Sequence, residues 1–344
     1  MAIFSPVDPV MAKGLMMSRP NLSPASLQIK DWAIAFLHPL RQPVTWACQH
    51  RLLPSRVRRV LPWRWALEPF TIYGNGWKSQ WFPAEFDDIS HIIFWSGLHG
   101  YEKETIPVIL DQVRQARCFI DVGANCGIYT VLGATVNSYA RIVAIEPVPK
   151  ICAALTNNVA RNKLDSRVTI LNIAVGNSNG GVAFHEAEDA RMGSLAVHGY
   201  QGQAGRLIRV ECRTLDSIVA ELNIEPDFIK IDVEGFSDAV LSGASRLLDK
   251  VRPRLVLEAN PDDPCLQITQ ILTHHRYAMH LITDNGPEWR EQIIPSAKYR
   301  NWLCLPLTGG SGGNRDIEGK AGSPLQRSTR RPRCPPDLDH LFGL

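Results

Sequence analysis

The chain has 344 residues, of which 45% are hydrophobic and 21% charged, and it carries a formal net charge of +3 at pH 7. This composition is typical of a globular protein that is long enough to bury a sizeable core. The nearly balanced charge disfavours a dedicated nucleic-acid-binding protein, which usually presents a basic stripe. We therefore expect no nucleic-acid partner.

The eight cysteines are scattered and form neither a CxxC pair nor a Cys/His cluster. This spacing disfavours a zinc site, and it suits a reducing cytosol better than a secreted, disulfide-rich fold. No stretch approaches about 18 uninterrupted apolar residues, and prolines interrupt the N-terminal region where a leader would need an apolar run. We predict a cytoplasmic protein with no integral membrane segment and no bound metal. The oligomeric state is left open.

Composition divides the chain into three zones. Residues 1–95 form a Trp- and Arg-rich extension, residues 96–307 alternate strand-like and helix-like segments, and residues 308–344 mix Gly, Ser, Pro and Arg with little to bury. We predict that the last zone is disordered. The arginines from Arg41 to Arg64 would suit an anionic surface, but the near-neutral chain favours a solvated, partly packed extension.

The central zone begins with apolar residues at helical spacing, for which Thr105 is the expected cap. Predicted helices cover residues 106–113, 127–136, 151–159, 215–222, 240–247 and 268–272. Predicted strands cover residues 118–123, 141–147, 168–176, 227–235, 254–260, 277–283 and 301–306. Residues 182–187 and 207–213 indicate a β-hairpin or another excursion after the third strand. This rhythm predicts an α/β fold with a mostly parallel sheet and helices on both faces.

Acidic residues stand at the carboxyl ends of four predicted strands. They are Asp121, Glu146, Asp232 with Glu234, and Glu258. Ligands of parallel sheets bind outside this edge. The recurrence of acids there predicts a binding site.

The segment DVGANCG, from Asp121 to Gly127, links the first strand to the next helix. Gly123 permits a tight turn and Gly127 a close approach of the helix to a ligand, so we expect a side chain at Gly123 to block binding. Asn125 stands where a dinucleotide fingerprint has its second glycine. A ligand without a phosphate therefore fits better. If such a ligand carries an ammonium group, Asp121 at the end of the strand is placed to hold that group. An ordinary glycine-containing turn is the alternative.

Glu146 follows the second strand at the distance expected of a ribose-binding acid. Its carboxylate can accept hydrogen bonds from both ribose hydroxyls. The alternative is a solvated acid before the turn at Pro147. The histidines His185 and His198, after the third strand, are interpreted as ordinary loop residues.

The segment DFIKIDVEG, residues 227–235, carries Lys230, Asp232 and Glu234, which strand alternation places on one side. Such charges are costly in a covered sheet unless they pair or face a cleft. Whether Lys230 is a structural partner or a site residue stays open. Asp232 and Glu234 lie nearer the carboxyl end, and we predict that they belong to the site.

The chain resembles the FkbM-type S-adenosylmethionine-dependent methyltransferases in the order of its segments CFIDVGANCG, IVAIEP, ILNIAVGN, VECRTLDSI, DFIKIDVEGF, VLSGA and RPRLVLEAN. The resemblance runs from about Gly100 to Pro306 and includes the short element GYE at its start. It departs at Ser237, where the family often has an acid; here Asp238 follows instead. The resemblance implies a Rossmann-like class I methyltransferase sheet and S-adenosylmethionine as the cofactor.

The resemblance also implies roles for individual residues. The cofactor-binding residues would be Asp121, Gly123, Asn125 and Gly127 in the loop, Glu146 at the ribose, and Ala174 and Val175 near the adenine. The catalytic residues would be Asp232 and Glu234, facing the methyl group and the acceptor. The implied acceptor is a hydroxyl group of a sugar, a glycan or another natural product.

Two other functions stay open. An NAD-dependent oxidoreductase on a Rossmann fold is disfavoured because the GxGxxG fingerprint is missing. A non-catalytic binding protein that keeps the methyltransferase fold is disfavoured because acids remain at positions 121, 146 and 232.

Overall fold

The computed structural model describes residues 38–54, 63–84, 88–187, 194–195, 205–294, 296 and 298–307. The chain divides into two units, Met1–Leu307 and Thr308–Leu344, and every described residue belongs to the first. The tail predicted to be disordered lies outside the described residues. The same holds for His198 and for Arg56, Arg58 and Arg59.

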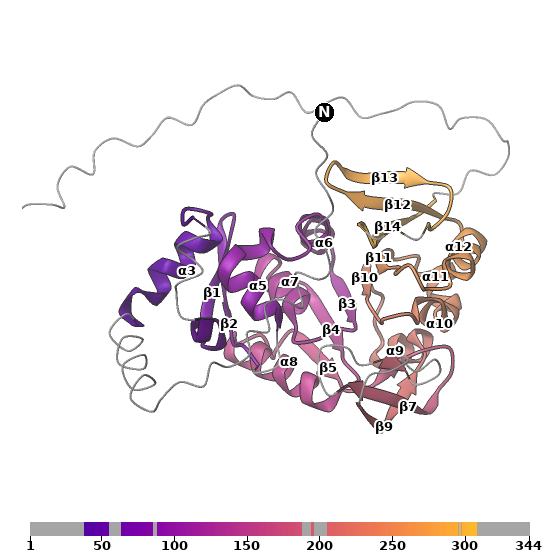
Figure 1. Cartoon of the computed structure of the whole chain (residues 1–344). Coiled ribbons are helices and arrows are strands. Elements are labelled where there is room, and N and C mark those ends of the chain that lie inside the picture. Colours follow the sequence, from indigo (N-terminus) through magenta and orange to yellow (C-terminus); the bar gives the residue numbers. More distant parts are fainter. Residues whose placement is uncertain are drawn as a thin grey trace, which may run out of the picture. The chain divides into compact units, whose positions relative to one another are not determined.

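An eight-stranded sheet with the order β13-β12-β14-β11-β10-β3-β4-β5 forms the centre of the first unit (Figure 1). Its strands are β3 (Cys118–Val122), β4 (Arg141–Ile145), β5 (Val168–Leu171), β10 (Phe228–Ile231), β11 (Arg254–Glu258), β12 (Tyr277–Thr283), β13 (Gly286–Arg290) and β14 (Asn301–Pro306). The strands from β5 to β11 in this order are parallel, whereas β14 is antiparallel to both of its neighbours. The predicted α/β fold with a mostly parallel, Rossmann-like sheet is confirmed.

The chain changes its direction of progress across the sheet at β3. It moves outward from β3 to β4 and β5, and later continues with β10 and β11 on the other side of β3. Ligands of open α/β sheets bind in the crevice that such a switch point leaves at the carboxyl ends of the strands. This topology places the glycine loop after β3 next to Asp232, which follows β10.

Apolar side chains of the strands alternate between two clusters, one on each face of the sheet. Phe119 and Phe228 stack on the first face with ring centroids 5.2 Å apart, while Ile120 and Ile229 belong to the second. The first face is covered by α6 (Thr105–Arg114), α7 (Ile128–Val136) and α8 (Pro149–Arg161). The second is covered by α9 (Leu215–Leu222), α10 (Ser237–Ser242), α11 (Ser245–Lys250) and α12 (Cys265–His274). Helices therefore lie on both faces, as predicted.

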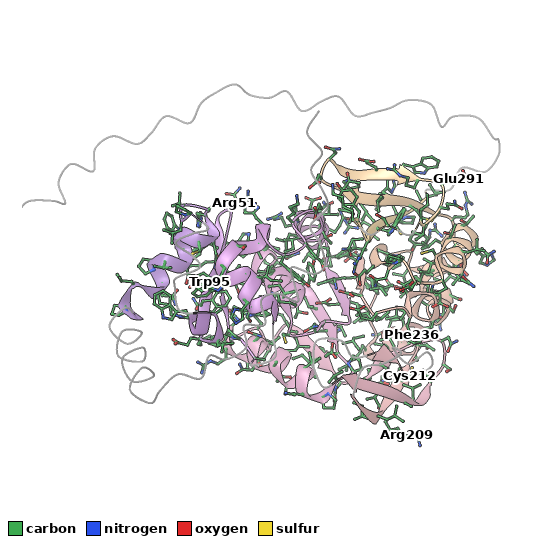
Figure 2. All side chains as sticks on the ribbon, in the orientation of Figure 1. Arg51, Trp95, Arg209, Cys212, Phe236 and Glu291 are labelled. Carbon is green, nitrogen blue, oxygen red and sulfur yellow. The ribbon has the colours of Figure 1, made fainter. Side chains whose placement is uncertain are left out.

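A second sheet with the order β6-β9-β7-β8 follows β5. It contains β6 (Ala174–Val175), β7 (Gly180–Ala187), β8 (Ser194–Leu195) and β9 (Gly205–Arg213), and β7 and β9 form the predicted hairpin. On β9 the side chain of Arg209 is exposed and that of Cys212 is buried (Figure 2). The single strand predicted over residues 168–176 was wrong. The Asn172 side chain donates to the carbonyl oxygens of Glu146 and Pro147 at 2.8 and 3.0 Å, and the chain leaves the main sheet there.

The described part of the N-terminal extension packs on the first face of the main sheet. It comprises η1 (His38–Leu40), α3 (Arg41–Gln49), η2 (Trp63–Leu67), β1 (Phe70–Gly74), β2 (Trp77–Trp81), α5 (Asp88–Ser96) and η3 (Gly97–His99). Trp65, Phe70, Trp81 and Phe94 are at most 1% exposed and share the cluster of α7 and α8. Trp95 is labelled in Figure 2. Its ring centroid lies 4.6 Å from that of Phe94. The domain boundary near residue 95 stays a prediction.

Arg41 departs from the solvated role predicted for the arginines of the extension. It is 4% exposed, and its guanidinium donates to the carbonyl oxygens of Trp65, Glu68 and Pro69. The side chain therefore satisfies buried backbone acceptors that would otherwise lack a donor.

Two helix predictions need correction. The helix predicted over residues 240–247 is split into α10 and α11 near Gly243, where a Cβ atom would lie 2.1 Å from the carbonyl oxygen of Gly176. Thr105 does not cap α6, because it is the first residue of the helix; the cap position is Glu104, and no side chain caps the helix there. Thr214 does cap α9, since its hydroxyl accepts the Ser217 amide at 3.1 Å.

None of the described helices combines the length and the apolar character that crossing a bilayer requires. None of the cysteines that the structure describes forms a disulfide, and all of them are buried.

Candidate functional site

The loop after β3 has three left-handed backbone positions. The angle φ is 76° at Gly123, 51° at Asn125 and 94° at Gly127. The amides of Gly123 and Ala124 both donate to the carbonyl oxygen of Ile145 at 2.9 Å, which ties the loop to the end of β4. Asn adopts left-handed conformations more readily than most residues with a Cβ atom. The loop therefore accommodates Asn125 where a dinucleotide fingerprint has glycine.

Gly123 lies against the backbone that follows β10. A Cβ atom at this position would stand 1.7 Å from the carbonyl oxygen of Asp232. The Asp232 amide in turn donates to the carbonyl oxygen of Val122 at 3.0 Å. The sequence predicted that Gly123 leaves room for a ligand; the structure shows that it leaves room for Asp232. A side chain at Gly123 therefore disturbs the local fold and not only the binding of a ligand.

Glu146 is 5% exposed at the end of β4. Its Oε2 accepts the amide of Asn125 at 3.0 Å, and its Oε1 accepts the amide of Val148 at 2.9 Å. Burial raises the pKa of Glu146 to about 7, against the opposing influence of these two amides. Each carboxylate oxygen has more than one acceptor position, so both can still receive a ribose hydroxyl.

Asp121 is fully buried in β3. Its Oδ2 accepts the hydroxyl of Thr130 at 2.7 Å, whereas its Oδ1 has no hydrogen-bond partner among the described residues. Burial raises the pKa of this carboxyl, although the nearby Lys230 lowers it. An unsatisfied buried acceptor is costly, so Asp121 is suited to a donor that a ligand brings.

Lys230 is buried in β10 and forms an ion pair with Asp232. Its Nζ lies 2.8 Å from Asp232 Oδ2 and 4.6 Å from the ring centroid of Tyr129. Burial disfavours the charged lysine, but Asp232, Asp121 and Glu102 outweigh burial and raise the pKa of Lys230. Of the two roles left open by the sequence, the structure shows the ion-pair partner.

Asp232, Glu234 and Glu258 converge at the carboxyl ends of β10 and β11. One carboxylate oxygen from each lies within 4.8 Å of the other two. Strand alternation is not the reason, because β10 ends at Ile231 and Glu234 has a left-handed φ of 44°. The turn after the strand brings Glu234 beside Asp232, and the geometry predicted from alternation was wrong.

The three carboxylates differ in their protonation. Burial and the charge of Asp232 raise the pKa of Glu258 to about 10, so Glu258 is protonated and supplies the proton of its hydrogen bond with Asp232. Burial also disfavours the ionised form of Asp232. The charge of Lys230 outweighs the effect of burial and lowers the pKa of Asp232. Loss of solvation around its carboxylate, with Asp232 and Asp263 nearby, raises the pKa of Glu234 to about 7.

These three side chains are also the described group that could hold a metal ion. Carboxylate oxygens are the ligands that Mg²⁺ and Ca²⁺ prefer. Here, however, Lys230 forms an ion pair with Asp232, and the pKa of Glu258 is raised to about 10, which favours a proton over a metal ion on this carboxyl. That no metal takes part stays a prediction.

Ala174 and Val175 are buried in β6 and pair with Cys212 and Arg213 of β9. They therefore belong to the second sheet and not to the edge that carries the carboxylates. Asn172, two residues earlier, ties this segment to the backbone of Glu146. Their place near an adenine stays a prediction.

Comparison with known proteins identifies the domain that contains this loop and these acids. Residues 121–279 match the family model described as methyltransferase FkbM domain. This part of the chain is therefore similar to the FkbM methyltransferase domain. This finding confirms the resemblance seen in the sequence and removes the oxidoreductase alternative.

Two kinds of relative accompany the FkbM match. Hexuronic acid methyltransferase AglP of Haloferax volcanii is 23% identical over 188 residues, which are 54% of this chain and 74% of AglP. The solved structure of methyltransferase FkbM from Methylobacillus flagellatus KT is 20% identical with a TM-score of 0.38, and the match covers 55% of this chain and 43% of that one. An O-methyltransferase family protein from Burkholderia thailandensis is 10% identical with a TM-score of 0.36, covering 65% and 61%. The chain thus spans less than two thirds of either solved protein.

Two residues to which sequence reasoning gave no site role contact the glycine loop or the helix after it. Glu102 accepts the hydroxyl of Tyr129 and the side-chain amide of Asn301. Asn158, fully buried in α8, donates to the carbonyl oxygen of Cys126 at 3.0 Å and accepts the amide of Phe82 at 2.9 Å. The polar Asn158 on the apolar face of a predicted helix was the available signal.

Proposed function

We propose that the protein transfers the methyl group of S-adenosylmethionine to a hydroxyl group of a sugar. The observation that carries the proposal is the meeting of an FkbM glycine loop with Asp232 and Glu234 at the switch point of the sheet. Parallel sheets bind ligands at this point, and the carboxylates next to the loop supply acceptors for a cationic cofactor and for a hydroxyl proton.

The residues around the loop fit S-adenosylmethionine. Glu146 offers a buried carboxylate to the ribose hydroxyls, and Asp121 offers Oδ1, which has no donor among the described residues. S-adenosylmethionine supplies a methyl group on a positively charged sulfur. The acids of the site lower the energy of a cation there, and the loop fixes its position, which matters because alignment alone is worth about 7–11 kcal/mol.

A sugar acid is the acceptor that we favour. The relative AglP is described as a hexuronic acid methyltransferase. In this chain Arg300 is exposed beside the site, where it donates to Asn260 at 3.2 Å. Its positive charge opposes the rise in the pKa of Glu234 that burial causes. A guanidinium in this place suits the carboxylate of a sugar acid, which it can bind through two parallel hydrogen bonds.

Glu234 is the better candidate for the base. A general base works best when its pKa is near the working pH, and the pKa of Glu234 is raised to about 7. Asp232 is a weaker base, because Lys230 and Glu258 both donate to it. We assign Asp232 the orientation of the acceptor hydroxyl and Glu234 the removal of its proton while the methyl group moves.

The test is methyl transfer from labelled S-adenosylmethionine to a set of sugars with and without a carboxylate. Glu234→Gln should lower turnover by at least about 10²-fold with unchanged affinity for S-adenosylhomocysteine. The control is Asp262→Asn, which removes an exposed acid from a loop near the site and should leave turnover unchanged. Normal turnover in both Glu234→Gln and Asp232→Asn would place the base elsewhere. Cofactor binding without transfer to any hydroxyl would favour a non-catalytic binding protein.

A further inference from the structure

Glu102 lies in the turn between η3 and α6, outside the residues that match the FkbM domain. Its φ is 38°, a left-handed value that residues with a Cβ atom rarely adopt. Its carbonyl oxygen accepts the amides of Thr105 and Ile106 at 2.9 and 3.0 Å, so α6 begins from this turn. The side chain of Glu102 is half-buried, whereas the next residue, Lys103, is exposed.

The carboxylate of Glu102 joins segments that are far apart in the sequence. Its Oε2 accepts the hydroxyl of Tyr129, in the first turn of α7, and the side-chain amide of Asn301, at the start of β14, at 3.4 Å. The Tyr129 ring also lies 4.6 Å from the Nζ of Lys230 in β10. Glu102 therefore reaches the carboxyl edge of the sheet beside the glycine loop.

Carboxyl groups outnumber basic groups here among the described residues. The carboxyl groups of Glu102, Asp121 and Asp232 all act on the ammonium group of Lys230, whose ion pair among these residues is with Asp232. Burial raises the pKa of both Glu102 and Asp121. In addition, the fully buried Oδ1 of Asp121 has no hydrogen-bond partner among the described residues. A cation with several N–H donors would supply the missing partner of Asp121, and Glu102, which already accepts from Tyr129 and Asn301, would add a second carboxylate.

The glycine loop connects both groups of acids. Asn125, within the loop, donates to Glu146, whereas Tyr129, just after the loop, donates to Glu102. If the ribose binds at Glu146, then Glu102 and Asp121 would be the carboxylates left for the amino-acid part of the cofactor.

We propose that Glu102 is a second ligand, beside Asp121, of the α-ammonium group of S-adenosylmethionine. This inference rests on the proposed function, because it assumes that cofactor. An ammonium group has three N–H donors and no acceptor, which matches two carboxylates from different segments.

The test compares two ligands by calorimetry on the full chain. S-adenosylhomocysteine carries the α-ammonium group, whereas 5′-methylthioadenosine has the same adenosine and sulfur without the amino-acid part. Glu102→Gln should weaken the affinity for S-adenosylhomocysteine by about 10- to 100-fold, which is the range for a charged hydrogen bond. The affinity for 5′-methylthioadenosine should not change.

The matched control is Glu104→Gln. Glu104 lies two residues further along, pairs only weakly with Lys103 at 3.6 Å, and loses the same charge; this variant should bind both ligands as the unmodified chain does. If Glu102→Gln does not fold, Tyr129→Phe serves instead, because it removes the hydroxyl that holds the Glu102 carboxylate in position. This variant too should lose affinity for S-adenosylhomocysteine only.

The outcomes separate this inference from the proposed function. If the unmodified chain binds neither ligand, the proposed cofactor is wrong and the inference falls with it. If the unmodified chain binds S-adenosylhomocysteine and Glu102→Gln binds it equally well, only the role of Glu102 is refuted. If Glu102→Gln weakened the affinity for both ligands equally, Glu102 would have a structural role, and the inference would also be overturned.

Discussion

A methyl group added at Gly123 provides a direct test of how the glycine loop packs. The Cβ atom of Gly123→Ala would stand 1.7 Å from the carbonyl oxygen of Asp232, whereas real Cβ contacts essentially never fall below 3.0 Å. The obstacle is backbone and not the end of a flexible side chain. Because the Asp232 amide also pairs with Val122, relief of the clash must separate the ends of β3 and β10.

The expected loss of stability has two parts. A residue with a Cβ atom at the left-handed φ of 76° pays about 1–2 kcal/mol. Overpacking against the Asp232 carbonyl adds about 1–3 kcal/mol. We therefore expect Gly123→Ala to lower the free energy of unfolding by about 2–5 kcal/mol, and to weaken cofactor binding because Asp232 moves.

Gly76, in the turn between β1 and β2, provides the control. Its φ is 78°, nearly the same as at Gly123, and a Cβ atom there meets nothing within 4 Å. Gly76→Ala should lower the free energy of unfolding only by the backbone contribution of about 1–2 kcal/mol. Urea unfolding of both variants measures the difference, which isolates the clash. Equal losses in the two variants would refute the contact between the glycine loop and Asp232.

Three further predictions concern binding, packing and metal. The pKa of Glu146 is raised to about 7, so this carboxyl is neutral below that pH and ionised above it. Ribose hydroxyls donate to the ionised form. The affinity for S-adenosylhomocysteine should therefore rise about tenfold from about pH 6 to about pH 8. Calorimetry of Glu146→Gln should show a weaker affinity without this rise, and a persistent rise would assign the titration to another group. Asn158→Ala should lower the free energy of unfolding by about 1–3 kcal/mol, because it removes two buried hydrogen bonds, one to the Cys126 carbonyl and one from the Phe82 amide. The exposed Asn157→Ala is the control, and an equal effect of the two would contradict this role. Methyl transfer should persist in EDTA, and loss of activity that magnesium restores would instead make the cluster of three acids a metal site.

Much of the fold could be predicted because the parallel strands are buried on both faces. Buried strands such as Cys118–Val122 and Arg254–Glu258 are short, apolar and separated by amphipathic helices, and this pattern is specific to covered sheets. The edge strand Gly286–Arg290 escaped prediction, because it is half exposed and contains no apolar alternation. The break at Asn172 escaped it as well, since it depends on a contact with Pro147 that no local pattern reveals.

The candidate site could be predicted only as a set of acids at one edge. The rule that ligands bind at the carboxyl ends of parallel strands brought Asp121, Asp232 and Glu258 into consideration. It could not show that Glu234 arrives through a left-handed turn. Nor could it find Glu102, whose partner Asn301 is separated from it by 199 residues.

The packing of the N-terminal extension affects how this enzyme can be divided for laboratory work. A protein that begins at residue 96 would keep the whole FkbM match, yet it would lose Trp65, Phe70, Trp81 and Phe94 from the interior. Each buried aromatic of this size contributes about 1.5–3 kcal/mol, and the face that they cover would become an apolar surface open to aggregation. The segment that carries the chemistry is therefore smaller than the segment that can fold by itself. Expression of the catalytic part alone should yield insoluble material, whatever the activity of the full chain.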